Sequence, residues 1–341
     1  MAFINAKDHF NTKIWNGNSS TQAITGVGFQ PDIVWGKQRT GTQAHQVLDV
    51  IRGANNILVS NTTAAAVADS NILNSFDSDG FTLGNQDQLN DTGATYVGWS
   101  WKVGGAGSAN TDGSINTTST SVNTTAGVSI STYTGTGAAA TIGHGLGVAP
   151  EVVICKELGA ATAWTNYHQA IGNTKYVHLC ESVAEDTSDI YFNNTTPTSS
   201  VFSVKTGGGT NRSGGNFVAY CFAPKTGFSA FGKYIGNGNV DGPMVITGFK
   251  PSLVIFKKTN DVGDWQIVDD QRDGYNPDND YLQANTNLAE QTTDIIDLVS
   301  NGFKIRGDNS NGWNKGSSTY LYMAFAKAPL VGSNNIPATA R

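Results

Sequence analysis

The sequence predicts an all-β protein made of three tandem antiparallel β-sandwich repeats, each with a jelly-roll-like arrangement of strands. Two observations lead to this prediction. The 341 residues include 40 glycines and only 14% charged residues, a composition that favours strands and turns over long exposed helices. In addition, four landmarks recur in the same order along three successive stretches of about 90 residues. Such a fixed period indicates that one structural unit is used several times.

The first two landmarks are an aromatic residue and a proline that stands 16 or 17 residues later, directly before an apolar run. Proline is tolerated at the first residue of a strand but not inside a central strand. Each proline is therefore predicted to mark the start of a strand. The three pairs are Trp15 and Pro31, Tyr133 and Pro150, and Tyr234 and Pro251.

The third landmark is a phenylalanine, and the fourth is an apolar run that closes each repeat. The closing runs carry large apolar residues on both faces, which predicts a central strand covered on both sides. The turn-forming residues before each run are predicted to form hairpin loops. The phenylalanines are Phe81, Phe202 and Phe303, the turns are 90–93, 211–214 and 314–317, and the closing runs are 96–102, 217–223 and 320–326.

These landmarks divide the chain into three units. The segment rich in Gly, Ser, Thr and Asn between the first two units predicts a flexible or extended linker, unless another surface holds it. The second and third units are joined almost directly, so we expect them to pack as a pair. Short helices are compatible with 47–51 and 288–294. The predicted division is a lead-in at 1–9, repeats at 10–103, 128–225 and 229–328, a linker at 104–127 and a tail at 329–341.

Composition excludes several classes of protein. The formal charge of −6 is spread thinly and no basic cluster occurs, so we expect no nucleic-acid partner. No segment approaches 18 consecutive apolar residues, and the N-terminus lacks a basic region followed by an apolar run, so we expect neither membrane insertion nor a secretory signal. Cys155, Cys180 and Cys221 are an odd number without paired spacing, which predicts buried free thiols.

One lysine recurs six residues after the strand-starting proline in every repeat. Two interpretations remain open for Lys37, Lys156 and Lys257. In one, the aliphatic part of each lysine side chain covers apolar surface while its ammonium group pairs with Asp49 or Asp269. In the other, the three lysines form a shared contact to a partner or a glycan.

Aromatic side chains offer a second set of candidate contacts. Trp164, Trp265 and Trp313, with Tyr167 and Tyr275, could stack on sugar rings if they are exposed. Core packing is the alternative interpretation, because it is the more common fate of tryptophan.

We expect no catalytic residue, no metal site and no cofactor, and hence no enzyme. The glycine-rich segment 206–215 lacks the lysine and the helix of a phosphate loop. The acidic run 269–280 carries oxygen ligands, but its spacing is not that of a calcium loop. Asp269 and Asp270 follow Trp265 without a second carboxylate across a cleft, as glycoside cleavage requires. The histidines show no metal-binding spacing.

Several sequence strings resemble a repeat family common in tailed bacteriophages, especially phages of marine bacteria and cyanobacteria. The resemblance covers nearly the whole chain. The strings are Gly-Phe-Gln-Pro-Asp-Ile-Val-Trp from Gly28, Val-Ile-Arg-Gly from Val50, Ser-Asp-Gly-Phe-Thr-Leu-Gly from Ser78, Ala-Gly-Val-Ser-Ile-Ser-Thr-Tyr-Thr-Gly from Ala126, Gly-His-Gly-Leu-Gly-Val-Ala-Pro from Gly143 and Tyr-Leu-Tyr-Met-Ala-Phe-Ala from Tyr320.

This resemblance implies a virion structural protein exposed on the particle surface, such as a tail fibre or appendage for host attachment. No catalytic residue is carried over from it. Because no long stalk and no heptad segment is present, a capsid decoration (cement) protein is the alternative, and a glycan-degrading tail enzyme is a third hypothesis. The expected partners are other virion proteins, further copies of the chain in a trimer, and a host surface glycan.

Overall fold

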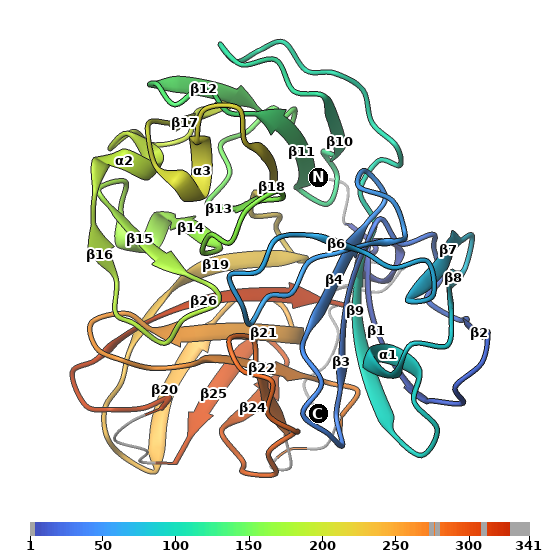
Figure 1. The fold of residues 1–341 in the computed structure, drawn as a ribbon. Helices are drawn as coiled ribbons and strands as arrows, with labels where there is room; N and C mark the ends of the chain where they lie inside the picture. Colours follow the sequence, from blue (N-terminus) through green and yellow to red (C-terminus); the bar gives the residue numbers. More distant parts are fainter. Residues whose placement is uncertain (1–3, 273–275, 277–279, 308–311, 328–341) are drawn as a thin grey trace.

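The computed structural model describes residues 4–272, 276, 280–307 and 312–327. Three β-rich lobes surround a common centre, with the first repeat in blue, the second in green and yellow, and the third in orange and red (Figure 1). Each lobe has a larger sheet facing the centre and a smaller one outside it. We call these the inner and outer sheets. The predicted all-β sandwich class is confirmed.

The first unit has a four-stranded inner sheet of order β1-β9-β3-β4 and an outer sheet of order β2-β8-β7. A small ribbon, a 3-10 turn and a one-turn helix complete it. The strands are β1 (Phe10–Asn16), β2 (Gln22–Ile24), β3 (Ile33–Gln38), β4 (Gln46–Asp49), β5 (Asn56–Ile57), β6 (Val67–Ala68), β7 (Leu73–Asp77), β8 (Gly80–Leu83) and β9 (Thr95–Trp101), with η1 (Ala6–Asp8) and α1 (Asp87–Asn90).

The second unit repeats this arrangement in a seven-stranded inner sheet of order β10-β11-β18-β13-β14-β15-β16, with β12 and β17 outside. Its strands are β10 (Ser119–Asn123), β11 (Val128–Thr134), β12 (Ala140–Gly143), β13 (Val152–Glu157), β14 (Thr165–His168), β15 (Lys175–His178), β16 (Asp186–Thr187), β17 (Val201–Val204) and β18 (Asn216–Phe222), with η2 (Gln169–Ile171), α2 (Asp189–Phe192) and α3 (Gly208–Asn211).

The third unit has a five-stranded inner sheet of order β19-β26-β21-β22-β23 and an outer sheet of order β20-β25-β24. Its strands are β19 (Ser229–Ile235), β20 (Asp241–Ile246), β21 (Pro251–Lys258), β22 (Trp265–Asp269), β23 (Tyr281–Gln283), β24 (Ile296–Val299), β25 (Gly302–Arg306) and β26 (Thr319–Ala326). The closing runs are thus β9, β18 and β26, central in their sheets as predicted, and the three prolines stand at or just before strand starts.

Several local predictions are wrong. The turns before the closing strands are not hairpin loops, because β8 and β9 belong to different sheets, as do β17 and β18, and β25 and β26. These turns cross from the outer sheet to the inner one. Residues 46–49 form β4 rather than a helix, and no helix occurs at 288–294. In both places tertiary packing overrides local pattern.

The predicted linker at 104–127 is folded onto the second unit. Its residues 119–123 form β10, which pairs with β11 and extends the inner sheet. Ile115 is buried in the sandwich core and bridges to Ile142. The surface that holds the segment is therefore the edge of β11. The second and third units pack against each other, as expected, and the first unit joins them, because buried residues of all three units share one core.

Each sandwich core contains aromatic residues at the same three positions, which are landmarks seen in the sequence. The opening aromatic stacks on the first residue of the closing run and meets the landmark phenylalanine edge to face, a geometry that aromatic rings prefer. The stacked pairs are Trp15 with Tyr96 at 5.7 Å, Tyr133 with Phe217 at 5.3 Å, and Tyr234 with Tyr320 at 4.8 Å between ring centroids.

A buried asparagine fixes each crossing turn. Asn90 shows the arrangement: its side-chain oxygen accepts the N–H of Asn18, and its amide donates to the carbonyls of Ser20 and Gly84. Asn211 and Asn314 make the equivalent bonds in the other units. The first residue of each crossing turn therefore ties this turn to the segment between the first two strands of the unit and to the end of the outer sheet.

Replacing Asn90 with Ala should lower the free energy of unfolding by about 3 kcal/mol, because a buried donor and acceptor set is left without partners. Chemical denaturation measures this loss. Asn55→Ala is the matched control, since Asn55 is exposed and exposed substitutions usually change stability by less than about 0.5 kcal/mol. Equal losses in the two variants would contradict the role given to Asn90.

Candidate functional site

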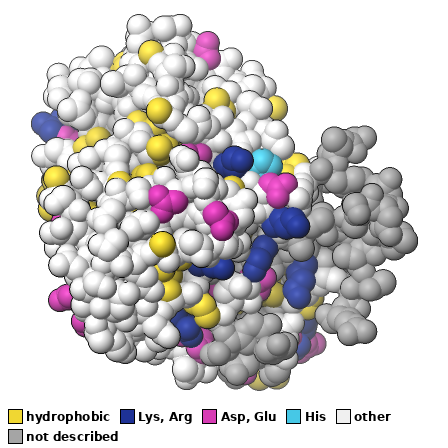
Figure 2. Space-filling view, turned by 90° about the vertical axis from the view of Figure 1, so that its right-hand side faces the viewer, with side chains coloured by type: hydrophobic (Ala, Val, Ile, Leu, Met, Phe, Trp, Pro, Cys, Tyr) yellow, Lys and Arg dark blue, Asp and Glu magenta, His cyan; other side chains and the backbone are white. Residues whose placement is uncertain are grey.

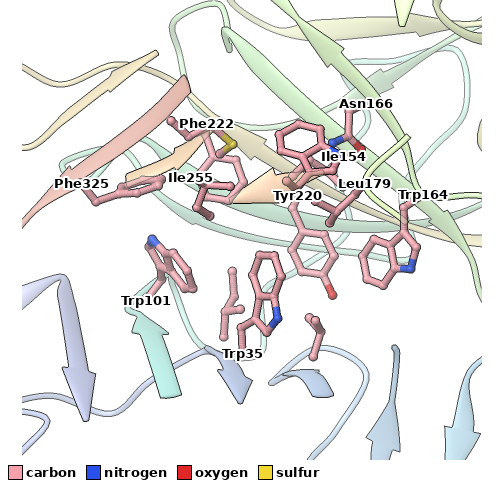
Figure 3. A pocket seen from close by; sticks show the side chains of 14 residues that line it. Trp35, Trp101, Ile154, Trp164, Asn166, Leu179, Tyr220, Phe222, Ile255 and Phe325 are labelled. Atoms are coloured by element: carbon pink, nitrogen blue, oxygen red, sulfur yellow. The ribbon is translucent and has the colours of Figure 1, made fainter. Parts of the chain in front are cut away.

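The inner faces of the three inner sheets meet in one apolar junction. It encloses a cavity of about 50 Å³, and the lining side chains point toward this common space from all three units (Figure 3). The labelled residues are Trp35 and Trp101 from the first unit, Ile154, Trp164, Asn166, Leu179, Tyr220 and Phe222 from the second, and Ile255 and Phe325 from the third.

A cyclic set of hydrogen bonds joins each unit to the next around the junction. The donors occupy equivalent positions at or directly before the starts of β4, β14 and β22. The acceptors are equivalent backbone carbonyls in or shortly after the strand that follows in the chain. His45 Nε2 donates to Gln283 O at 3.0 Å, Trp164 Nε1 to Val59 O at 2.9 Å, and Trp265 Nε1 to His178 O at 2.8 Å.

A second cyclic set joins the closing strands to the ends of β4, β14 and β22. Tyr220 donates to Asp49 at 2.6 Å, and Trp99 donates to Asp269 at 3.0 Å. In the third unit the equivalent closing-strand position is Met323, which cannot donate. The residue opposite it, at the position in the second unit that is equivalent to Asp49 and Asp269, is His168. Its ring donates to the backbone carbonyl of Tyr322 at 3.1 Å. The third contact is thus kept by exchanging donor and acceptor.

The two junction histidines are held neutral. Burial lowers the pKa of His168 to about 4 and that of His45 well below its usual value. The Nδ1 atom of His45 accepts from the indole of Trp35, and that of His168 accepts from the N–H of Ala170. Each ring therefore carries its proton on Nε2, where it donates across to the third unit.

The two junction aspartates are paired with arginines. Asp49 binds Arg52 at 2.5 Å, and Asp269 binds Arg272 at 2.7 Å. Burial opposes the charged form of both arginines, but the neighbouring carboxylates hold the pKa of each above its usual value. Because Asp49 and Asp269 are fully buried, they face no cleft that could admit a glycan. The acidic run at 269–280 begins with this buried pair, whereas 273–275 and 277–279 lie outside the described residues.

The three recurring lysines are buried, with no exposed surface. Their ammonium groups do not meet Asp49 or Asp269, and burial keeps them from a surface contact. They bind backbone carbonyls instead: Lys37 those of Gln38 and Gly41, Lys156 those of Thr63, Glu157 and Ala160, and Lys257 that of Gly263. Burial lowers the pKa of each lysine to about 8.

Among the predicted aromatic contacts, Trp164, Tyr167 and Trp265 are 1% exposed. Trp164 and Trp265 belong to the junction, and Tyr275 lies outside the described residues. Trp313 is different. Although it is only 7% exposed, it lines a surface hollow in the third unit, together with Tyr281, Gln266, Gln283 and Asp264.

This third-unit hollow has a volume of about 460 Å³, within the range of roughly 300–1,000 Å³ typical of small-molecule sites. Trp313 and Tyr281 form an aromatic wall with ring centroids 5.9 Å apart. Trp313 is fixed at both ends, because its indole donates to Arg306 O at 2.7 Å and its own carbonyl accepts from Tyr234. The charged groups Lys258, Asp261 and Asp264 complete the lining.

Gln266 carries an unsatisfied amide in this hollow. It is 2% exposed, and its side-chain oxygen accepts no hydrogen bond within the part of the chain that the structure describes. The equivalent residue in the second unit, Thr165, also has an unpaired buried oxygen. There α3 closes the site: a Cβ on Gly209 would come within 2.2 Å of Thr165 Oγ1.

The walls of the third-unit hollow depend on the other two units. Gln283, on one side, accepts the hydrogen bond from His45 of the first unit. Gly263, on another, donates to Ser182 O of the second unit at 2.8 Å. Sequence reasoning found Trp313 but missed Gln266, Tyr281, Gln283 and Asp264. The available signal was that Gln266, inside an apolar strand, is polar.

Cys155, Cys180 and Cys221 are buried free thiols, as predicted. Over the described ranges, no group of three or more His, Cys, Asp and Glu side chains is placed to hold a metal ion. None of the helices in those ranges could cross a bilayer.

The fold and its junction define an all-β protein of three fused sandwiches. Residues 5–329 match the model of a family described as a domain of unknown function, DUF7483. The chain therefore belongs to this family. No curated protein matches the sequence.

Asn166 is the one amide that lines the cavity at the junction, where the equivalent residues are Val47 and Ile267. Its side-chain oxygen is buried, with no partner among the described residues. Asn166→Val should therefore raise the free energy of unfolding by about 1–2 kcal/mol, because an unsatisfied polar group is removed. Val47→Asn is the matched reverse change and should destabilise. Denaturant titration measures both, and a destabilised Asn166→Val variant would contradict this account.

Lys37 should make stability rise with pH. Its pKa is about 8 in the folded chain and about 10.4 when unfolded. Between these values the unfolded chain binds the proton and the folded chain does not, so folding becomes more favourable as pH rises. Relative to Lys37→Met, the wild type should gain roughly 3 kcal/mol of unfolding free energy from pH 7.5 to pH 10.5. Parallel pH dependence in the two proteins, measured by denaturant titration, would rule this out.

Proposed function

We propose that this protein is a non-catalytic structural and binding component of a bacteriophage particle, exposed on its surface as a tail fibre or appendage for host attachment. The observation that carries the proposal is a rigid three-unit frame whose scaffold residues recur while its loops differ. The resemblance of nearly the whole sequence to phage virion repeats supports this location.

The rigidity of the frame follows from its junction. Apolar inner faces exclude water, and two cyclic sets of hydrogen bonds fix the orientation of each unit relative to its neighbours. Buried polar groups have strict geometric requirements and so help to specify one arrangement. Binding residues commonly lie on loops that such a scaffold positions.

The loops at equivalent places differ between units. After β3, β13 and β21, for example, the segments 39–45, 158–164 and 259–264 share little sequence. The crossing turns differ as well: α1 and α3 occupy them in the first two units, whereas Gly312 and Trp313 border a hollow in the third. One frame thus presents three unlike surfaces to partners.

The exposed surface supports contact with a neutral partner better than contact with nucleic acid. Figure 2 shows a face on which uncharged polar groups and backbone predominate, with apolar side chains scattered and charged side chains of both signs interspersed. The sequence has only 21 Lys and Arg residues against 27 Asp and Glu residues. A strong electrostatic contribution to phosphate binding is therefore missing.

The second candidate is a capsid decoration protein. The observation that favours it is the cyclic order of contacts around one axis, which gives a single chain an approximate threefold symmetry. The approximate symmetry of such a body matches that of a threefold-symmetric position on a capsid. In this role it would contribute stability by burying interface area.

Electron cryo-microscopy of particles carrying a tagged copy of this chain tests both candidates. Tag density on the tail or on an appendage is the expected result, and density spread over the head would instead establish decoration. The matched control is a particle with an untagged copy. Intact particles that contain the chain in neither place would refute the virion assignment altogether.

A further inference from the structure

We propose that Glu290 is an acid-sensitive clasp between the third unit and the first. In its charged form it holds residues 285–294, which we call the strap, against the first unit. In its protonated form it releases the strap while the three sandwiches stay folded. Such a release is a local change of shape, and it does not depend on where in a particle the chain is located.

A third cyclic set of hydrogen bonds identifies the strap. In each unit a loop returns from a short strand, and a backbone N–H at its end donates to a carbonyl of a neighbouring unit. The accepting residue always stands two places after the recurring lysine. The bonds run from Ala66 N–H to Leu158 O at 2.8 Å, from Glu185 N–H to Thr259 O at 2.7 Å, and from Glu290 N–H to Arg39 O at 2.8 Å.

The border between the third and first units differs from the other two. The chain passes from the first unit to the second and from the second to the third, but within the described residues it does not pass from the third to the first. An ion pair crosses this border instead. Arg39 Nε donates to both oxygens of Glu290, at 2.9 and 3.0 Å, and its Nη2 donates to one of them at 2.6 Å.

This ion pair is the one that joins two units. Among pairs of described residues, every other ion pair lies within a single unit. A bidentate pair between a guanidinium group and a carboxylate is strong and also fixes orientation. The contact that closes the three-unit body at its chain-free border therefore depends on one carboxylate.

The surroundings of Glu290 favour its charged form. Its second partner is Arg272, which is fully buried and binds Glu290 at 2.8 Å and Asp269 at 2.7 Å. Lys37 of the first unit adds another positive charge nearby. Burial opposes the charge on Glu290, but Arg39 and Arg272 hold the pKa of this carboxyl below its usual value. His45, at the same border, is held neutral by its burial, which keeps its pKa low.

The strap itself has little else to hold it. None of residues 285–294 is buried, whereas Ala284 before them and Ile295 after them are completely buried. The largest apolar side chain of the strap, Leu288, is 48% exposed. Segments with few buried apolar contacts open locally at a lower cost in free energy than the core around them.

Neighbouring contacts keep the border closed when the strap is released. Just before the strap, Ser60 of the first unit donates to Ala284 O at 2.9 Å, and the hydrogen bond from His45 to Gln283 O lies next to it. These contacts involve no carboxylate. The change is therefore confined to the strap and does not open the apolar junction.

The direction of the pH effect follows from the charge of Glu290. A glutamate in an unfolded chain has a pKa of about 4.3, and in the folded chain the pKa of Glu290 is lower. Its stabilising contribution is therefore complete above about pH 4.3 and is lost as the pH falls through the folded-state pKa. The strap is held at neutral pH and released in acid.

The equivalent loop of the second unit provides a matched control. Glu185 stands at the position of Glu290, and its N–H makes the same contact to the neighbouring unit. Its carboxylate, however, binds Lys175 of its own unit at 2.5 Å. A change at Glu185 thus removes a carboxylate from an equivalent loop without removing an ion pair between units.

Hydrogen exchange of the full chain, followed by mass spectrometry and corrected for intrinsic rates, tests the clasp. At pH 7, Glu290→Gln should exchange about tenfold faster than wild type at 285–294, a change that corresponds to about 1.4 kcal/mol. Acidifying the wild type to about pH 3 should produce a similar increase, and the difference between the two proteins should then disappear. Glu185→Gln should change exchange in its own loop by less than about threefold.

Arg39→Gln removes the partner of the clasp from the first unit, and it should release the strap at pH 7 as Glu290→Gln does. Equal protection of the strap in wild type and both variants would contradict the clasp, as would a wild-type strap that stays protected at about pH 3. Faster exchange spread over all three sandwiches in Glu290→Gln at pH 7 would also overturn it, because Glu290 would then support the whole fold rather than the strap.

Discussion

Each sandwich in this chain has a second apolar face that its own outer sheet cannot cover. The closing strands carry large apolar residues on both sides, so one side packs on the outer sheet and the other must leave water by meeting the neighbouring units. At about 25 cal/mol for each Å² of apolar surface buried, covering three such faces is the main contribution that unites the units. The remaining features of the structure depend on this three-way contact.

Apolar burial is not directional, and polar groups supply the direction. Trp164, Trp265 and His45 reach from one unit to a backbone carbonyl of the next, which fixes rotation as well as distance. Where Met323 cannot donate, His168 does so from the opposite side. A hydrogen bond between neighbouring units is thus found at the equivalent place in all three contacts, although the donor and acceptor residues differ. The same carbonyl that accepts from His45 belongs to Gln283 at the edge of the third-unit hollow, so this candidate site requires the assembled body.

Much of the fold was predictable because its landmarks act locally. The strand-starting prolines follow from the missing backbone donor of proline, and the closing strands from apolar residues on both faces. The crossing turns resemble hairpin loops in sequence, because turn residues indicate a reversal of the chain but not which sheet the next strand joins. The polar side chains of residues 119–123 indicate a linker, and they form a strand only because the edge of β11 offers a pairing partner.

The candidate site was less predictable, because exposure is a property of the assembled units. Trp164 and Trp313 are the same residue type, yet the first seals the junction and the second lines a hollow. The sequence by itself determined the repeat, the all-β class and the residues that build each sandwich, since these depend on periodicity and on backbone preferences. Only the tertiary structure decided which polar groups form hydrogen bonds inside the protein and which remain available to a ligand. That choice depends on how three surfaces, distant in the sequence, cover one another.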